Sequence, residues 1–163
     1  MRDRLLTQIQ AYMERSFPAS ANTVTLTRDA YDQLASTVGT LPPESGAVIG
    51  GPADRPALIS QVWFDGQAGS GNFFYTPTPR DLEATVAQWE GQHCRFRGIV
   101  HSHGPGYRAL SPTDIESGTL FMEANGLSQI LLGLFCEGEL LMFRLTARNL
   151  TPEPLSVTVI SVV

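Results

Sequence analysis

The stretch Gly98-Ile-Val-His-Ser-His103 decides how this chain is organised. The apolar run from Phe96 onward predicts a buried strand that ends in the two histidines. Because side chains alternate between the two faces of a strand, His101 and His103 should share one face, and Ser102 should lie on the other. Two imidazoles side by side, at a strand end where the sheet opens, can bind one metal ion.

A carboxylate follows this pair at a spacing that can supply a third ligand. After seven further residues comes Ser111-Pro-Thr-Asp114, which has the composition of a helix start: Ser as the N-cap, Pro at the first helical position and an acid at N3. Such a cap fixes where the acid points, so Asp114 can return to the face that carries the histidines. His-His-carboxylate leaves one position of a tetrahedral zinc open, and a catalytic site keeps that position for water.

Other interpretations of these residues are open at this point. Two histidines at a strand end also occur as ordinary polar side chains, and Ser111 with Asp114 is also a plain helix start. Metallo-β-lactamase-like sites need H-x-H-x-D-H, whereas Gly104-Pro105 follows the second histidine here. H-x-H amidohydrolases are built on (β/α)₈ barrels of roughly 200 residues or more. This chain, with 163 residues, is too short for such a barrel.

The pattern H-x-H-x(7)-S-x(2)-D resembles the signature of the JAMM (MPN+) metalloproteases, zinc peptidases that cleave isopeptide or peptide bonds beside ubiquitin-like proteins. That family adds a glutamate upstream, on a segment that ends in an apolar run and glycine. Here the segment runs from Pro42 to Gly51, and Glu44 matches the family's catalytic acid in its spacing from Gly51. The family often has proline after the second histidine and before the serine, whereas this chain has Gly104 and Leu110 there.

The resemblance implies a role for each matching residue. His101, His103 and Asp114 would hold one Zn²⁺ ion, whose bound water has a pKa of about 7. Glu44 would take the proton from that water and later hand it to the leaving amine. Ser111 would donate a hydrogen bond to the oxyanion of the tetrahedral intermediate.

The composition is that of an ordinary globular domain, with 42% hydrophobic and 17% charged residues. A net charge of −5 and the lack of an arginine cluster argue against nucleic acid as a partner. No apolar run is as long as a membrane span and no signal-peptide segment follows the N-terminus, so we expect no membrane partner. Cys94 and Cys136 lie in strand-like surroundings, which favours reduced thiols and a cytoplasmic protein.

The chain divides into a short N-terminal segment and one domain. Residues 1–22 predict an amphipathic helix and a linker, and the apolar stripe of the helix is formed by Leu5, Ile9, Tyr12 and Met13. This helix would pack on the domain or mediate self-association into a homo-oligomer. Residues 23–163 predict a single α/β domain, a mixed twisted β-sheet sandwiched between helices, which is also the fold that the resemblance implies.

Local signals predict several elements of that domain. Thr27 should cap a helix that follows a short strand. The apolar segment from Ala57 to Phe64 should form one strand. A hairpin is expected across Glu137-Gly138, between two segments rich in sheet-forming residues.

The substrate prediction depends on the compactness of the chain. Eukaryotic JAMM proteins carry insertions that recognise ubiquitin, and no long insertion follows Glu44 or Asp114 here. The chain is therefore similar to compact prokaryotic members, which trim or release ubiquitin-like and sulfur-carrier proteins that end in a flexible Gly-Gly tail. The segments Asp65–Asn72 and Gly104–Arg108 are the expected walls of a groove for that tail. A non-catalytic MPN scaffold and a general zinc peptidase acting on small peptides are the alternatives.

Overall fold

The computed structural model describes residues 22–40, 45–65 and 79–161, which form a mixed sheet and three helices. The helices are α2 (Arg28–Ser36), α3 (Pro79–Gly91) and α4 (Pro112–Asn125). The strands are β1 (Thr23–Thr27), β2 (Gly46–Pro52), β3 (Leu58–Ile59), β4 (Gln61–Phe64), β5 (Cys94–Ser102), β6 (Gln129–Cys136), β7 (Glu139–Thr146) and β8 (Asn149–Ile160). Their order across the sheet is β3-β1-β8-β7-β6-β5-β2-β4. The predicted α/β class and mixed sheet are confirmed, and the helix predicted near the N-terminus lies outside the described residues.

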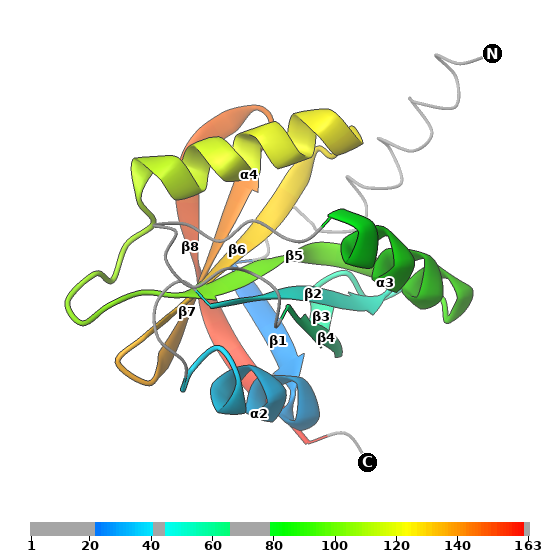
Figure 1. Ribbon diagram of the computed structural model, residues 1–163, viewed down its shortest axis with the longest axis horizontal. Coiled ribbons are helices and arrows are strands. Elements are labelled where there is room, and N and C mark those ends of the chain that lie inside the picture. Colours follow the sequence, from blue (N-terminus) through cyan, green and yellow to red (C-terminus); the bar gives the residue numbers. More distant parts are fainter. Residues whose placement is uncertain (1–21, 41–44, 66–78, 162–163) are drawn as a thin grey trace.

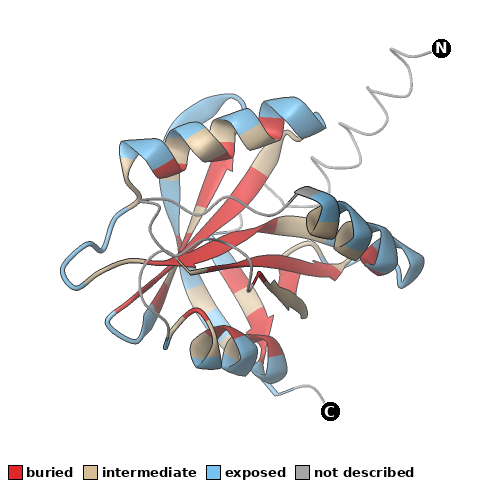
Figure 2. Cartoon of the chain, viewed as in Figure 1, coloured by how far each residue is buried: buried red, intermediate tan, exposed pale blue. Residues whose placement is uncertain are grey.

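The helices lie against different faces of this sheet, with α2 and α4 on opposite sides (Figure 1). On β5, Val100 packs in one buried cluster with Leu34 of α2, whereas the preceding Ile99 packs with Met122 of α4. A smaller cluster around Trp89 holds α3. Figure 2 shows the buried residues gathered along the central strands. Burying one large apolar side chain contributes about 1.5–3 kcal/mol to the stability of the fold. The burial of Val100 on one face and of Ile99 on the other therefore fixes the face that each β5 residue takes. None of the helices in the described residues has both the length and the apolar composition of a membrane span.

The segment from Ala57 to Phe64 forms two short strands, so the prediction of a single strand is wrong. β3 pairs in parallel with β1, and β4 pairs antiparallel with β2 at the opposite end of the strand order. Between them the Ser60 N–H donates to the Gly50 carbonyl at 3.0 Å. A Cβ atom at Gly51 would lie 1.9 Å from the Leu58 carbonyl oxygen, so only glycine allows this approach. The pairing partner changes at Ser60, and the apolar pattern of the segment does not show that change.

Two local predictions are confirmed. The Thr27 hydroxyl accepts a hydrogen bond from the Ala30 N–H at 3.2 Å and caps α2. Glu137 and Gly138 have φ angles of 52° and 78° and form the turn between β6 and β7. Positive φ at both central residues is what the tightest hairpin turns require.

The β5–α4–β6 unit positions the two parts of the predicted site. β5 and β6 are parallel neighbours, and α4 lies in the connection between them. In such a unit the helix runs back along the strands, so its first turn lies beside the end of the strand that precedes it. The chain stays bound to the sheet just past β5, where the His103 N–H donates to the Phe135 carbonyl at 2.8 Å.

Candidate metal centre

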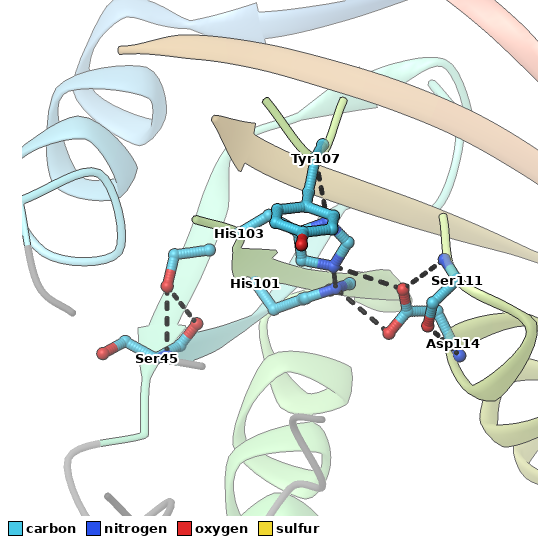
Figure 3. Close-up of polar contacts among 7 residues, drawn as sticks. Ser45, His101, His103, Tyr107, Ser111 and Asp114 are labelled. Atoms are coloured by element: carbon cyan, nitrogen blue, oxygen red, sulfur yellow. Dashed lines mark hydrogen bonds and ion pairs between the residues drawn. The ribbon is translucent and has the colours of Figure 1, made fainter. Parts of the chain in front are cut away.

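The two histidines and the aspartate predicted as ligands meet at the end of β5 (Figure 3). One nitrogen or oxygen atom from each of His101, His103 and Asp114 lies within 4.8 Å of the others. The two Nε2 atoms are 2.9 Å apart, and each is 3.2 Å from a different oxygen of the Asp114 carboxylate. Donor atoms around a tetrahedral zinc are separated by roughly 3.3 Å, as its bond lengths require. The three side chains therefore have the spacing of ligands to one metal ion.

Burial and charge also favour a cation at this position. The side chains of His101 and Asp114 are 6% and 5% exposed. Burial by itself would raise the pKa of Asp114, but hydrogen bonds from His101, His103 and the Ser111 amide outweigh it and hold that pKa well below its usual value. A charged carboxylate removed from water needs a positive or hydrogen-bonding partner, and a metal ion supplies one.

Ser111 holds Asp114 in place through the start of α4. The Ser111 Oγ atom accepts from the Asp114 N–H at 3.1 Å, and Asp114 Oδ2 accepts from the Ser111 N–H at 2.7 Å. This reciprocal capping box, with Pro112 next to the cap, confirms the predicted helix start. In the cap the hydroxyl acts as an acceptor, so its hydrogen can still be donated to another group.

A backbone carbonyl orients the second histidine. The His103 Nδ1 atom lies 3.0 Å from the Tyr107 carbonyl oxygen. A carbonyl oxygen only accepts, so Nδ1 carries a hydrogen, and Nε2 is the ring atom that faces Asp114. Metal-ligating histidines are commonly held by such a carbonyl. The sequence interpretation missed this contact, although Pro105-Gly106 is a turn signal that points to it.

Glu44, the predicted acid–base residue, lies outside the described residues, but its neighbour Ser45 lies within them. The Ser45 N–H donates to the Ser102 hydroxyl at 3.1 Å, and the Ser45 carbonyl accepts from the Ser102 N–H at 2.9 Å. Ser102 thus points away from the histidines, as strand alternation predicts, and Figure 3 shows Ser45 apart from the ligand cluster. The segment that leads into β2 is held at the end of β5, a long-range contact without a signal in the sequence.

The structure describes one of the two predicted groove walls. The segment Gly104–Arg108 directly follows His103, and its Tyr107 side chain is 72% exposed. Of the segment Asp65–Asn72 only Asp65 lies within the described residues, and it is buried. The exposed ring of Tyr107 is therefore the aromatic group that this part of the chain presents beside the ligands.

Comparison with protein-family models and with curated proteins finds no match to the sequence. Among solved structures, the chain is similar to protein DSY2949 from Desulfitobacterium hafniense, with a TM-score of 0.64 and 15% identity over 86% of this chain and 95% of that chain. It is also similar to AF2198, a JAB1/MPN domain protein from Archaeoglobus fulgidus, with a TM-score of 0.49 and 14% identity over 86% of this chain and 100% of that chain. The likeness to DSY2949 shows a shared α/β fold, and a fold alone does not determine chemistry. What this chain can do therefore follows from its His-His-Asp cluster, which could hold a metal ion.

Proposed function

We propose that this chain is a zinc-dependent metallopeptidase of the JAMM type, which cleaves the peptide or isopeptide bond after the Gly-Gly tail of a ubiquitin-like or sulfur-carrier protein. The observation that carries the proposal is the convergence of His101, His103 and Asp114 within 4.8 Å, next to a serine that caps the same helix. The sequence pattern over these residues resembles that of JAMM proteases. The proposed catalytic domain spans residues 23–163, its sheet sandwiched between helices, and residues 1–22 would add an N-terminal amphipathic helix and a linker.

The proposed mechanism gives each residue one task. The three ligands would hold one Zn²⁺ ion, which when bound would supply Lewis-acid chemistry. Glu44 takes the proton of the attacking water and delivers it to the leaving amine. This role is supported by the sequence, in which the spacing of Glu44 from Gly51 resembles that of the catalytic acid in JAMM proteases. Ser111 donates its hydroxyl hydrogen to the oxyanion of the intermediate.

The same site argues against a purely structural protein. A scaffold that serves only assembly has no need for two imidazoles and a carboxylate that converge in a buried position. Here the ionised Asp114 is 3.2 Å from both His101 and His103. Strongly perturbed, partnered ionisable groups of this kind are concentrated at functional sites.

The proposal extends to the compartment and the partner. Cys94 and Cys136 are buried and form no disulfide. Thiols of this kind are usual where proteins are kept reduced. We therefore propose a cytoplasmic enzyme whose partner is the tailed carrier protein.

A carrier protein joined through its Gly-Gly tail to a short peptide tests this function. The zinc-loaded full chain should cut after the second glycine, and the masses of the products locate the cut. A matched carrier that ends in Ala-Ala should react roughly 10-fold or more slowly, because added methyl groups must fit a site shaped for glycine. Equal cleavage of the free peptide would instead identify a general peptidase. Zinc binding without cleavage of any substrate would favour the scaffold.

Ser111→Ala should lower both catalysis and stability, with the larger effect on catalysis. Loss of an oxyanion donor reduces kcat by about 10²–10³-fold, whereas loss of an N-cap reduces the free energy of unfolding by about 1 kcal/mol. Thr27→Ala is the matched control, because Thr27 caps α2 through the same kind of bond and takes no part in the proposed site. Both variants should unfold at lower denaturant concentration, and only Ser111→Ala should lose kcat. Unchanged kcat in Ser111→Ala would show that the serine is only a cap.

A further inference from the structure

The four residues after His103 form a tight turn. The Tyr107 N–H donates to the Gly104 carbonyl at 3.2 Å. Pro105 occupies the second position, and Gly106 occupies the third with a φ angle of 83°. Proline followed by a residue with positive φ is the pattern of a type II turn, in which glycine is strongly preferred at the third position.

This turn directs a carbonyl at the metal-binding histidine. After the chain reverses, the Tyr107 carbonyl oxygen lies 3.0 Å from His103 Nδ1 (Figure 3). The torsion that rotates an imidazole ring about its bond to Cβ has broad minima, so the ring has no strong orientation of its own. The hydrogen bond to Tyr107 supplies that orientation and keeps a hydrogen on Nδ1, so that Nε2 faces Asp114.

The turn is fastened at both ends to the β6–β7 hairpin. At its start, the Cys136 thiol donates to the Gly104 carbonyl at 3.5 Å. At its end, the Arg108 guanidinium donates to the Glu139 carboxylate and lies 4.0 Å from the Glu137 carboxylate. Cys136, Glu137 and Glu139 are neighbours at the tip of the hairpin. The turn that carries the Tyr107 carbonyl is therefore bonded on both sides to the end of the paired strands β6 and β7.

We propose that the turn Gly104–Tyr107, fastened by Arg108 to the β6–β7 hairpin, is a positioning device that sets the zinc affinity of the site by fixing the His103 ring. The inference deepens the proposed function and rests on its metal site. Outer contacts that orient a ligating histidine typically change metal affinity by about 10–100-fold. A ring that is already oriented loses less freedom when the metal binds, which is why the fold of the turn contributes to affinity.

Gly106→Ala tests the turn with little other disturbance. A Cβ at Gly106 has no heavy atom within 4 Å, so the substitution strains only the backbone at φ 83°. Gly126→Ala is the matched control, because Gly126 also has positive φ, 62°, and no heavy atom within 4 Å of an added Cβ. It ends α4, whereas the ligand Asp114 lies in the first turn of that helix.

Both glycine variants should show similar, small decreases in the denaturant midpoint. Only Gly106→Ala should bind zinc about 10-fold or more weakly, measured by competition with a chelator of known affinity. The ¹⁵N chemical shifts of the His103 ring in the zinc-stripped protein give a second readout. Wild type and Gly126→Ala should show an Nδ1 that carries a hydrogen, and Gly106→Ala should show less hydrogen on Nδ1.

A charge exchange tests the fastening independently of the turn. Arg108 and Glu139 are exposed, so Arg108→Glu should fold. It should weaken zinc binding by several-fold, less than the roughly 10-fold expected for Gly106→Ala, because exposed ion pairs are weak. Adding Glu139→Arg should restore the affinity, because the pair is re-formed with its charges exchanged.

The proposal would be overturned if the zinc affinity and the His103 ring shifts of Gly106→Ala equalled those of Gly126→Ala. If wild type itself fails to bind zinc, the proposed function fails, and the ring shifts of the zinc-stripped proteins still decide the positioning role.

Discussion

His101→Ala should remove zinc from the protein, whereas wild type should hold about one zinc per chain. His101 supplies one of the three ligand atoms, and alanine offers no ligand atom in its place. Two ligands seldom hold zinc, because catalytic sites use three protein ligands and structural sites use four. Elemental analysis after dialysis against metal-free buffer measures the loss.

Two further variants sharpen this test. His93→Ala removes an exposed histidine in the turn between α3 and β5 and should keep its zinc. Asp114→Asn retains an oxygen that can accept from the Ser111 N–H but removes the negative charge, so it should keep the α4 cap and bind zinc far more weakly. Full zinc occupancy in His101→Ala would show that the cluster is not the metal site.

The site could be predicted to the extent that it is local in sequence. Strand alternation alone places His101 and His103 on one face, and the four residues from Ser111 to Asp114 contain the whole capping box. Only one long-range step was needed, the return of α4 to the end of β5. The β5–α4–β6 connection makes that step almost unavoidable, because a helix between parallel strands begins where the first strand ends.

The parts that could not be predicted depend on pairing between distant segments or on backbone groups. Ser60 separates two strands because β1 and β2 lie at different places in the sheet, and hydrophobicity does not encode this. Ser45 meets Ser102 across 57 positions of the chain. The Tyr107 carbonyl orients His103. Every residue carries a backbone carbonyl, so only its position in the turn gives the Tyr107 carbonyl this role. Sequence patterns predict the roles of side chains more readily than they predict contacts of backbone groups.

The fold and the chemistry rest on different evidence. The likeness to DSY2949, at 15% identity, shows the α/β fold and leaves the reaction open. The geometry of three ligand atoms, each within about 3 Å of another, is a property of side chains and is the reason to propose hydrolysis. An experiment that separates metal binding from turnover is therefore the most informative test of the proposed mechanism.

Glu44→Gln should provide that separation, because it should abolish turnover while zinc stays bound. Glutamine has nearly the same size as glutamate but cannot accept a proton, and loss of a general base typically lowers the rate by about 10²–10⁴-fold. The matched control is Glu116→Gln, the same chemical change at an exposed position two residues after Asp114, which should leave kcat near that of wild type. Both variants are assayed for zinc content and for cleavage of the Gly-Gly-tailed carrier.

If Glu44→Gln loses its zinc, Glu44 is a ligand of the metal. If it retains most of its activity, the base lies elsewhere, and a rate loss in Glu116→Gln would identify Glu116 as that base.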